Sequence, residues 1–412
     1  MTNRILFQTD AVCVEYFSAA HAKLALLFSP QLRGDLSGNP DQGVRLLQQG
    51  FDVLAFKINN EDWFQSVPAN LLKALANLIL RRRYQETVAY GTALGAYAAA
   101  AFSGWFNPQR ALLISPQFSV DDGFALSQDC TFFICYDPHS SGQQAVEKLR
   151  ALIPDGKLRL ITVPFAGEPS GTCLMEAGLL AQLEHQVLAQ AAVGDWTFRR
   201  AKAGSVAYLF HLGTALLQRN KRNTALGVTA KALQINPQIG SLHARQAAIL
   251  AQLGKHQAAI AAWQTAIALE PDNPEWHYQL SLGLLHLDRV SEALNASSHV
   301  MQLVTDNHGF WGYHSNLLWR NGQTEASLAA ILTALELDPT NAHYHAHKSG
   351  MLQALARLDD AILAASDALA LAPDDQALLA HLNALRLKKQ QSLPVPVLPP
   401  MVNLDQLLAP WR

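Results

Sequence analysis

The sequence predicts a multidomain chain whose first part is α/β and whose second part is all-α. From about residue 24 to residue 190, short apolar runs such as "FDVLAFKIN" alternate with amphipathic segments such as "GQQAVEKLRALI". Continuous apolar strands separated by helices are typical of a parallel sheet that helices cover on both faces. After about residue 200 the strand-like runs end and a 34-residue repeat begins. We therefore expect an α/β sandwich followed by a helical array.

Composition and charge exclude several classes of protein. The chain has 412 residues, of which 50% are hydrophobic and 16% charged, as expected for a globular protein of two or three domains. A formal net charge of −2 argues against nucleic-acid binding, which needs a concentrated excess of lysine and arginine. The four cysteines lack metal-ligand spacing, so we expect reduced core residues and no cofactor. No segment has the pattern of a membrane span or a secretory signal, so we expect a cytoplasmic protein without a transmembrane segment.

The first part has a strand, a glycine-flanked turn and an alanine-rich helix in succession. The expected strands lie in "KLALLFSP", "FDVLAFKIN", "ETVAYG", "RALLISP", "CTFFICYD" and "LRLITVPF". The stretch "GTALG" at residues 91–95 follows the third of them and is typical of a nucleophile elbow, a strained turn that presents a serine above a parallel sheet. Its central residue is Ala93. The strand order and the elbow resemble the α/β-hydrolase fold.

This resemblance implies three triad positions: the elbow, an acid after a later strand and a histidine after the last strand. They fall on Ala93, on Asp137 in "FFICYDPHSSG" and on Glu168 in "ITVPFAGEPSG". Ala93 has no heteroatom, and an ionised Glu168 can only accept hydrogen bonds and would repel Asp137, so neither can do the work of its triad position. We therefore expect a hydrolase-like domain over residues 1–190 that is catalytically inactive. Its two elbow glycines are then expected to serve the turn and the close packing of the helix.

A relocated nucleophile is the alternative. Thr92 lies beside the elbow centre, and Ser29 and Ser115 end two of the strands, at the edge where α/β proteins place ligand contacts. The favoured interpretation is that Ser29 and Ser115 cap turns before prolines. The rival function is a hydrolase or acyl-transfer enzyme with a non-standard nucleophile, whose substrate the second part recruits.

Small residues and prolines recur at fixed positions in the second part. The repeat prolines are Pro237, Pro271, Pro339 and Pro373, and Thr305 occupies the equivalent place in the third repeat. With this place numbered 32, position 20 holds Ala225, Ala259, Ala293, Ser327 and Ala361. Small residues let two antiparallel helices cross closely, and the proline ends the second helix. The pattern resembles the tetratricopeptide repeat (TPR), which implies five repeats and a capping helix over residues 206–390, after a linker at 191–205.

In TPR arrays the first helix of each repeat lines a groove that binds protein partners. Its usual positions are 2, 5, 9, 12 and 13. The predicted binding residues are Tyr278, Leu282, His286, Asn316, Trp319, Arg320 and His343, and the first repeat adds Phe210 and Gln218. Position 9 often uses asparagine to hold a peptide backbone, and an arginine can pair with a carboxylate. This mixed aromatic and polar set favours an extended peptide as the partner.

Two further features bear on ligands and assembly. Of His343, His345 and His347, the first and last share a helix face, and two imidazoles are too few for a closed zinc site, so we expect no metal. These histidines can still make binding depend on pH between 6 and 7. The tail at 391–412 is proline-rich and then places Leu404 and Trp411 on one helical face. It is predicted to dock on this chain or on a neighbouring subunit of a homo-oligomer, the alternative being a frayed end.

The expected function is a non-catalytic scaffold or adaptor with a pseudoenzyme domain. Hybrids of this kind look like accessory proteins of bacterial surface-polysaccharide or secretion systems. The resemblance therefore also suggests a bacterial accessory role.

Overall fold

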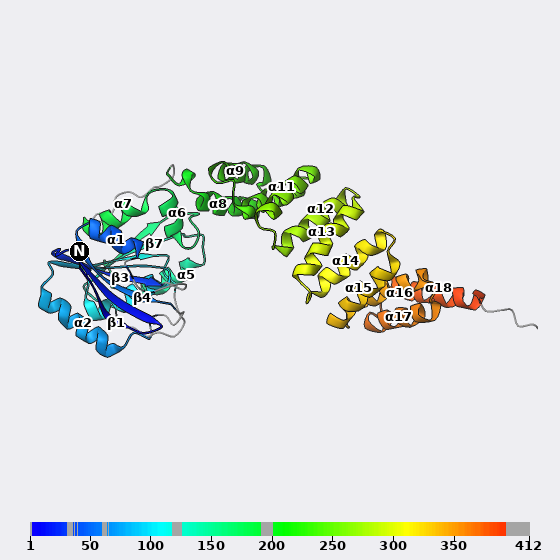
Figure 1. Ribbon diagram of the computed structural model, residues 1–412, viewed down its shortest axis with the longest axis horizontal. Helices are drawn as coiled ribbons and strands as arrows, with labels where there is room; N and C mark the ends of the chain where they lie inside the picture. Colours follow the sequence, from blue (N-terminus) through cyan, green and yellow to red (C-terminus); the bar gives the residue numbers. More distant parts are fainter. Residues whose placement is uncertain are drawn as a thin grey trace, which may run out of the picture. The chain divides into compact units, whose positions relative to one another are not determined.

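The computed structural model describes residues 2–30, 36, 38, 40–59, 64, 66–117, 126–190 and 201–392. The chain divides into two compact units, Met1–Gln238 and Ile239–Arg412. The first unit is built on a β-sheet and the second is helical (Figure 1). The prediction of an α/β part followed by a helical part is confirmed. Part of the predicted linker (191–200) and the tail from residue 393 lie outside the described residues.

The described part of the first unit contains an eight-stranded sheet. Its strands are β1 (Thr2–Gln8), β2 (Val12–Ser18), β3 (Lys23–Pro30), β4 (Phe51–Ile58), β5 (Glu86–Thr92), β6 (Arg110–Ile114), β7 (Thr131–Tyr136) and β8 (Leu158–Thr162). They are ordered β1-β2-β4-β3-β5-β6-β7-β8. Strand β2 is antiparallel to both of its neighbours, and the other neighbouring pairs are parallel. The six predicted strands correspond to β3 to β8, whereas the β1–β2 hairpin was not predicted.

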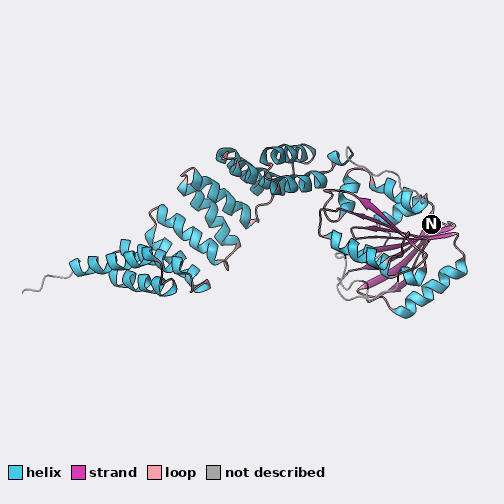
Figure 2. Ribbon diagram, turned by 180° about the vertical axis from the view of Figure 1, so that it is seen from behind, coloured by secondary structure: helices cyan, strands magenta, loops and turns pink. Residues whose placement is uncertain are grey.

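Helices cover both faces of this sheet, as Figure 2 shows. They are α1 (Asp41–Gln48), α2 (Ala69–Arg82), α3 (Leu94–Ala101), α4 (Ser103–Phe106), α5 (Gly142–Leu152), α6 (Ser170–Glu176) and α7 (Leu180–Glu184), with a π-helical turn η1 (His185–Ala189). Successive strand residues alternate between two cores. Phe56 belongs to the core that includes residues of α2, α3 and α5, and Ala55 belongs to the core that includes residues of α1, α6 and α7. All four cysteines are buried and none forms a disulfide, as expected of core residues.

The first helical hairpin belongs to the first compact unit. It consists of α8 (Val206–Gln218) and α9 (Arg222–Ile235), which follow a short 3-10 turn, η2 (Ala201–Gly204). Glu176 Oε2 accepts hydrogen bonds from Ser205 Oγ (2.7 Å) and from the amide of Ala207 (2.9 Å), so α6 fixes the start of α8. Lys202 Nζ donates to the Pro164 carbonyl (2.9 Å). The first compact unit thus includes the α8–α9 hairpin, which the sequence assigned to the repeat array. The domain limits given by the sequence stay a prediction.

The second unit consists of helical hairpins and a final helix. Its helices are α10 (Gly240–Gln252), α11 (His256–Leu269), α12 (Pro274–His286), α13 (Val290–Leu303), α14 (His308–Arg320), α15 (Thr324–Leu337), α16 (Ala342–Ala354), α17 (Leu358–Leu371) and α18 (Gln376–Ser392). The small residues at position 20 are buried in every repeat, which confirms the predicted close helix crossings. No helix in the described ranges is long and apolar enough to cross a membrane.

Two kinds of hydrogen bond recur at fixed positions of the third, fourth and fifth repeats. At position 8, Ser281, Ser315 and Ser349 donate to the carbonyls of Ala293 (2.6 Å), Ser327 (2.9 Å) and Ala361 (2.7 Å). At position 4, a ring nitrogen lies 2.9 Å from a carbonyl oxygen of the preceding repeat. The pairs are His277 with Pro271, Trp311 with Thr305, and His345 with Pro339. The first joins the helices of one repeat and the second joins successive repeats. His345 therefore has a structural partner.

Candidate functional site

The turn after β5 has the backbone conformation of an elbow. Ala93 has φ 51° and ψ −117°, a left-handed conformation that L-residues rarely adopt. Its amide donates to the Ile114 carbonyl of β6 (2.9 Å), and its own carbonyl accepts from the amide of Ala96 in α3 (3.1 Å). Strained backbone of this kind clusters at functional sites. Here the strained position carries only a methyl group.

The two elbow glycines are required by close approach. A Cβ atom on Gly91 would overlap the carbonyl oxygen of Gly95, and one on Gly95 would overlap the carbonyl oxygen of Phe28 in β3. Both obstacles are backbone atoms, which cannot rotate away. The glycines therefore hold α3 against the sheet whatever residue stands at position 93.

The two carboxylates of the predicted triad positions bind backbone and hydroxyl groups. Asp137, which follows β7 and is 3% exposed, accepts hydrogen bonds from the amides of His139 (2.9 Å), Phe165 (3.0 Å) and Gly167 (2.9 Å). Glu168 is exposed and accepts from Ser140 Oγ (2.6 Å), Ser141 Oγ (3.0 Å) and the amide of Gly142. Asp137 thus fixes the loop after β8, and Glu168 caps the start of α5.

The alternative nucleophiles differ in their surroundings. Ser115 is buried at φ 47°, its Oγ lies 2.8 Å from Ser170 Oγ, and it accepts a hydrogen bond from the amide of Ser170 (2.7 Å). This hydroxyl therefore ties the end of β6 to α6. Ser29 and Thr92 are half-buried at the ends of β3 and β5.

A polar cavity of about 460 Å³ lies beside these carboxylates, within the first unit. We call it the carboxylate cavity. It is lined by Asp137, His139, Ser140, Ser141, Phe165, Gly167, Glu168, His211, Thr214, Ala215, Gln218 and Arg219. The loops after β7 and β8 form one side and α8 the other. Gly167 has φ 75°, and a Cβ atom there would overlap the His211 ring, so a glycine lets α8 approach the loop. The His139 and Phe165 rings stack at 4.5 Å.

A buried ion pair supports the strand that leads to the elbow. Glu184 of α7 is fully buried and accepts hydrogen bonds from Arg45 Nε (2.8 Å) and Nη2 (2.7 Å) and from the Tyr90 hydroxyl (2.8 Å). Burial raises the pKa of Tyr90, and the hydrogen bond to Glu184 raises the pKa of Arg45. Sequence reasoning missed this network because its members lie 94 and 139 residues apart.

Aromatic residues lie on the first helices of the third and fourth repeats. The ring of Tyr278 lies 5.2 Å from that of Phe310 and 5.0 Å from that of Tyr313, the latter edge to face. Burial raises the pKa of Tyr278. Leu282, one turn further along α12, is half-buried. Tyr278 therefore forms part of an aromatic cluster that spans α12 and α14.

The polar groove candidates are exposed. Asn316 and Arg320 lie one turn apart on α14, and Arg320 Nη2 is 3.9 Å from Asp288 Oδ1, a loose surface pair. His286 is exposed and stacks on His256 at 4.9 Å. A solvent-accessible amide and guanidinium on one helix can hydrogen-bond an incoming main chain or carboxylate.

Trp319 and the histidines of α16 are positioned differently. The Trp319 ring is half-buried, 6.3 Å from the ring of His347. Burial lowers the pKa of His347 and of His314. His343 is exposed at the start of α16. His343 and Asn316 are therefore open to a partner, whereas His347 is partly enclosed.

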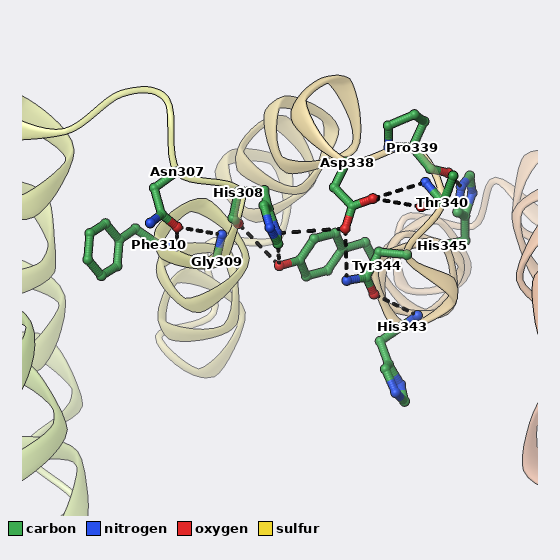
Figure 3. A network of polar contacts seen from close by, with 11 residues as sticks. Asn307, His308, Gly309, Phe310, Asp338, Pro339, Thr340, His343, Tyr344 and His345 are labelled. Carbon is green, nitrogen blue, oxygen red and sulfur yellow. Dashed lines mark hydrogen bonds and ion pairs between the residues drawn. The ribbon is translucent and has the colours of Figure 1, made fainter. Parts of the chain in front are cut away.

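A polar network joins the fourth and fifth repeats (Figure 3). The Tyr344 hydroxyl donates to the His308 carbonyl (3.2 Å) and lies 3.0 Å from His308 Nδ1. Asn307 caps α14 through the amides of Gly309 (2.9 Å) and Phe310, and Asn341 caps α16 (3.1 Å to the His343 amide). Asparagine is a preferred residue at a helix start, so these two caps could have been predicted from the sequence. The network fixes the position of α14 relative to α16, the first helices of the fourth and fifth repeats.

Comparison with known proteins identifies the repeat in the second part of the chain. Residues 247–287 match the family described as "TPR repeat". Similar solved structures include YrrB, "a TPR protein with an unusual peptide-binding site" (17% identity, 45% of this chain and 95% of that one, TM-score 0.42). Others are a MamA protein from Desulfovibrio magneticus (18%, 46% and 97%, 0.36) and a thermophilic TPR protein from Thermus thermophilus (20%, 44% and 100%, 0.32). No curated protein matches the chain.

Proposed function

We propose that the protein is a non-catalytic scaffold or adaptor that binds partner segments through the groove of its TPR array. Its first unit is then an α/β-hydrolase-like domain that has lost hydrolase chemistry. The observation that carries this proposal is Ala93, a residue without a nucleophilic atom in a strained elbow. Acyl transfer through an elbow requires a hydroxyl or thiol at this position.

Sheet topology and the surroundings of the elbow support the hydrolase-like assignment. The strand order, the antiparallel β2 and the elbow after β5 are the features that this proposal requires. The acid position after β7 is occupied by Asp137, and the loop after β8 lies against it. The carboxylate now organises that loop through two of its backbone amides. A domain of this kind keeps its architecture for stability and for presenting loops.

The groove residues support binding of an extended segment. Asn316 and Arg320 offer donors on an exposed helix face, and Tyr278 offers an aromatic surface one repeat away. Amide and guanidinium donors bind a main chain or a carboxylate, and an aromatic ring buries an apolar side chain. The bacterial accessory role and the cytoplasmic location stay predictions from the sequence.

The test is quantitative capture of partners from an extract of the source cells. Replacing Asn316 and Arg320 together by alanine is expected to reduce recovery of specific partners about tenfold, with the melting temperature nearly unchanged, because both side chains are exposed. A matched control replaces Asn295 and Arg289, in and just before the second helix of the third repeat, and is expected to capture as the unaltered protein does. Equal recovery by all three proteins would place the binding surface elsewhere.

A further inference from the structure

The carboxylate cavity has more negative than positive charge. Among its described lining residues, Asp137 and Glu168 are carboxylates and Arg219 is the guanidinium. A smaller adjoining cavity of about 230 Å³ shares Ser141 and Glu168 and has Lys148 on its lining. The excess of negative charge therefore lies in the carboxylate cavity and not in the smaller cavity that adjoins it.

The two carboxylates keep acceptor capacity. Among the residues that the structure describes, Glu168 Oε2 accepts one hydrogen bond, from Ser141 Oγ at 3.0 Å, and Asp137 Oδ2 accepts one, from the Gly167 amide at 2.9 Å. A carboxylate oxygen has two lone pairs, so each of these atoms can accept a second hydrogen bond. Donors that approach along the cavity are thus favoured over acceptors.

The opposite wall of the cavity is a groove helix. Thr214 and Gln218 of α8 occupy positions 9 and 13 of the first repeat, the positions that are expected to face a partner in a TPR array. A segment lying along this helix would have the loops after β7 and β8 on its other side. The cavity volume, about 460 Å³, is enough for a long side chain and the adjacent main chain.

We propose that the carboxylate cavity binds a lysine or arginine side chain of the partner segment, with its cationic group between Glu168 and Asp137. This proposal rests on the proposed function, because it assumes a partner segment in the groove. It identifies that segment as basic at the end nearest the first repeat. Charge-assisted hydrogen bonds to two carboxylates provide the selectivity for a cation.

The test uses a fluorescein-labelled peptide, Ala-Ala-Lys-Ala-Ala with blocked ends, and the full-length protein in fluorescence anisotropy at low ionic strength. Peptides with norleucine, glutamate or arginine in place of lysine complete the series. The lysine and arginine peptides are expected to bind at least about tenfold more tightly than the other two, and to weaken as salt is added.

Variants locate the site. Glu168→Gln keeps the size and an acceptor oxygen and is expected to remove most of the lysine preference. Ala215→Leu fills the cavity from α8 without touching a charge, and is expected to weaken the lysine peptide about tenfold. Glu147→Gln removes an exposed carboxylate of α5, paired with Arg150, and should change nothing.

Equal binding of the lysine and norleucine peptides would overturn the proposal. So would a lysine preference that survives both Glu168→Gln and Ala215→Leu. Replacing Asn316 and Arg320 does not alter the cavity and is expected to leave the lysine preference intact. Failure of this inference is thereby distinguished from failure of the groove proposal.

Discussion

Replacing Gly95 with alanine should destabilise the first unit by about 1–3 kcal/mol. The new methyl group would overlap the carbonyl oxygen of Phe28 and lie 2.9 Å from its carbonyl carbon, in the interior of β3. Helix α3 must then move away from the sheet. The gain in helix propensity, about 1 kcal/mol, offsets only part of this cost. Gly227 in α9 is the matched control, because a Cβ atom built there meets no described atom within 4 Å apart from its chain neighbours and the backbone of its own helix. Its replacement by alanine should stabilise the first unit by up to about 1 kcal/mol.

Cysteine labelling in urea measures this prediction in the first unit alone. All four cysteines are buried within Met1–Gln238, so they react with a thiol reagent only when that unit opens. The midpoint of labelling should fall by roughly 0.5–1 M urea in Gly95→Ala and stay equal or rise slightly in Gly227→Ala. A Gly95→Ala protein as resistant as the Gly227→Ala protein would refute the argument that close approach requires a glycine in the elbow.

Three further predictions concern strain, packing and protonation. Ala93→Gly should stabilise the first unit by about 1 kcal/mol in the same labelling assay, because it relieves a strained φ at a smaller cost in chain entropy. Ala259→Leu should destabilise the array by roughly 1–3 kcal/mol in thermal melts, whereas Ala261→Leu, on the exposed face of the same helix, should have little effect. Burial lowers the pKa of His314 and His347, so the unfolded chain binds more protons than the folded chain near pH 6. The array should therefore melt at a lower temperature at pH 5.5 than at pH 7.5. Glutamine at both positions should reduce this difference in melting temperature.

Strands with a continuous apolar pattern are the easiest to predict from the sequence. Runs such as residues 51–58 are buried along their whole length, and such strands can be recognised from apolar character alone. The β1–β2 hairpin was missed because β2 carries Glu15 at its centre. That buried carboxylate is paired with Lys57 of β4 at 2.7 Å and accepts a hydrogen bond from Asn3 of β1, partners that a local pattern does not reveal.

In the candidate site too, features set by local sequence could be predicted and features set by distant contacts could not. The elbow was predictable, since glycine spacing is a local signal, and the structure gives Ala93 the strained conformation expected. The carboxylate cavity was not, because it depends on contacts between distant segments, such as Gly167 with His211. Gln218 was predicted as a groove residue from its repeat position. Its place opposite Glu168 in one cavity follows only from the packing of α8 on the sheet loops.

Under the proposed function, the elbow has kept its architecture without a nucleophile. Incubation of the full-length protein with a fluorophosphonate, followed by intact mass measurement, is the decisive test. We expect an unchanged mass and no esterase activity above background, because Ala93 offers no atom to phosphonylate. A mass increase mapped to Thr92, Ser29 or Ser115 would contradict it and would identify the protein as a hydrolase with a relocated nucleophile.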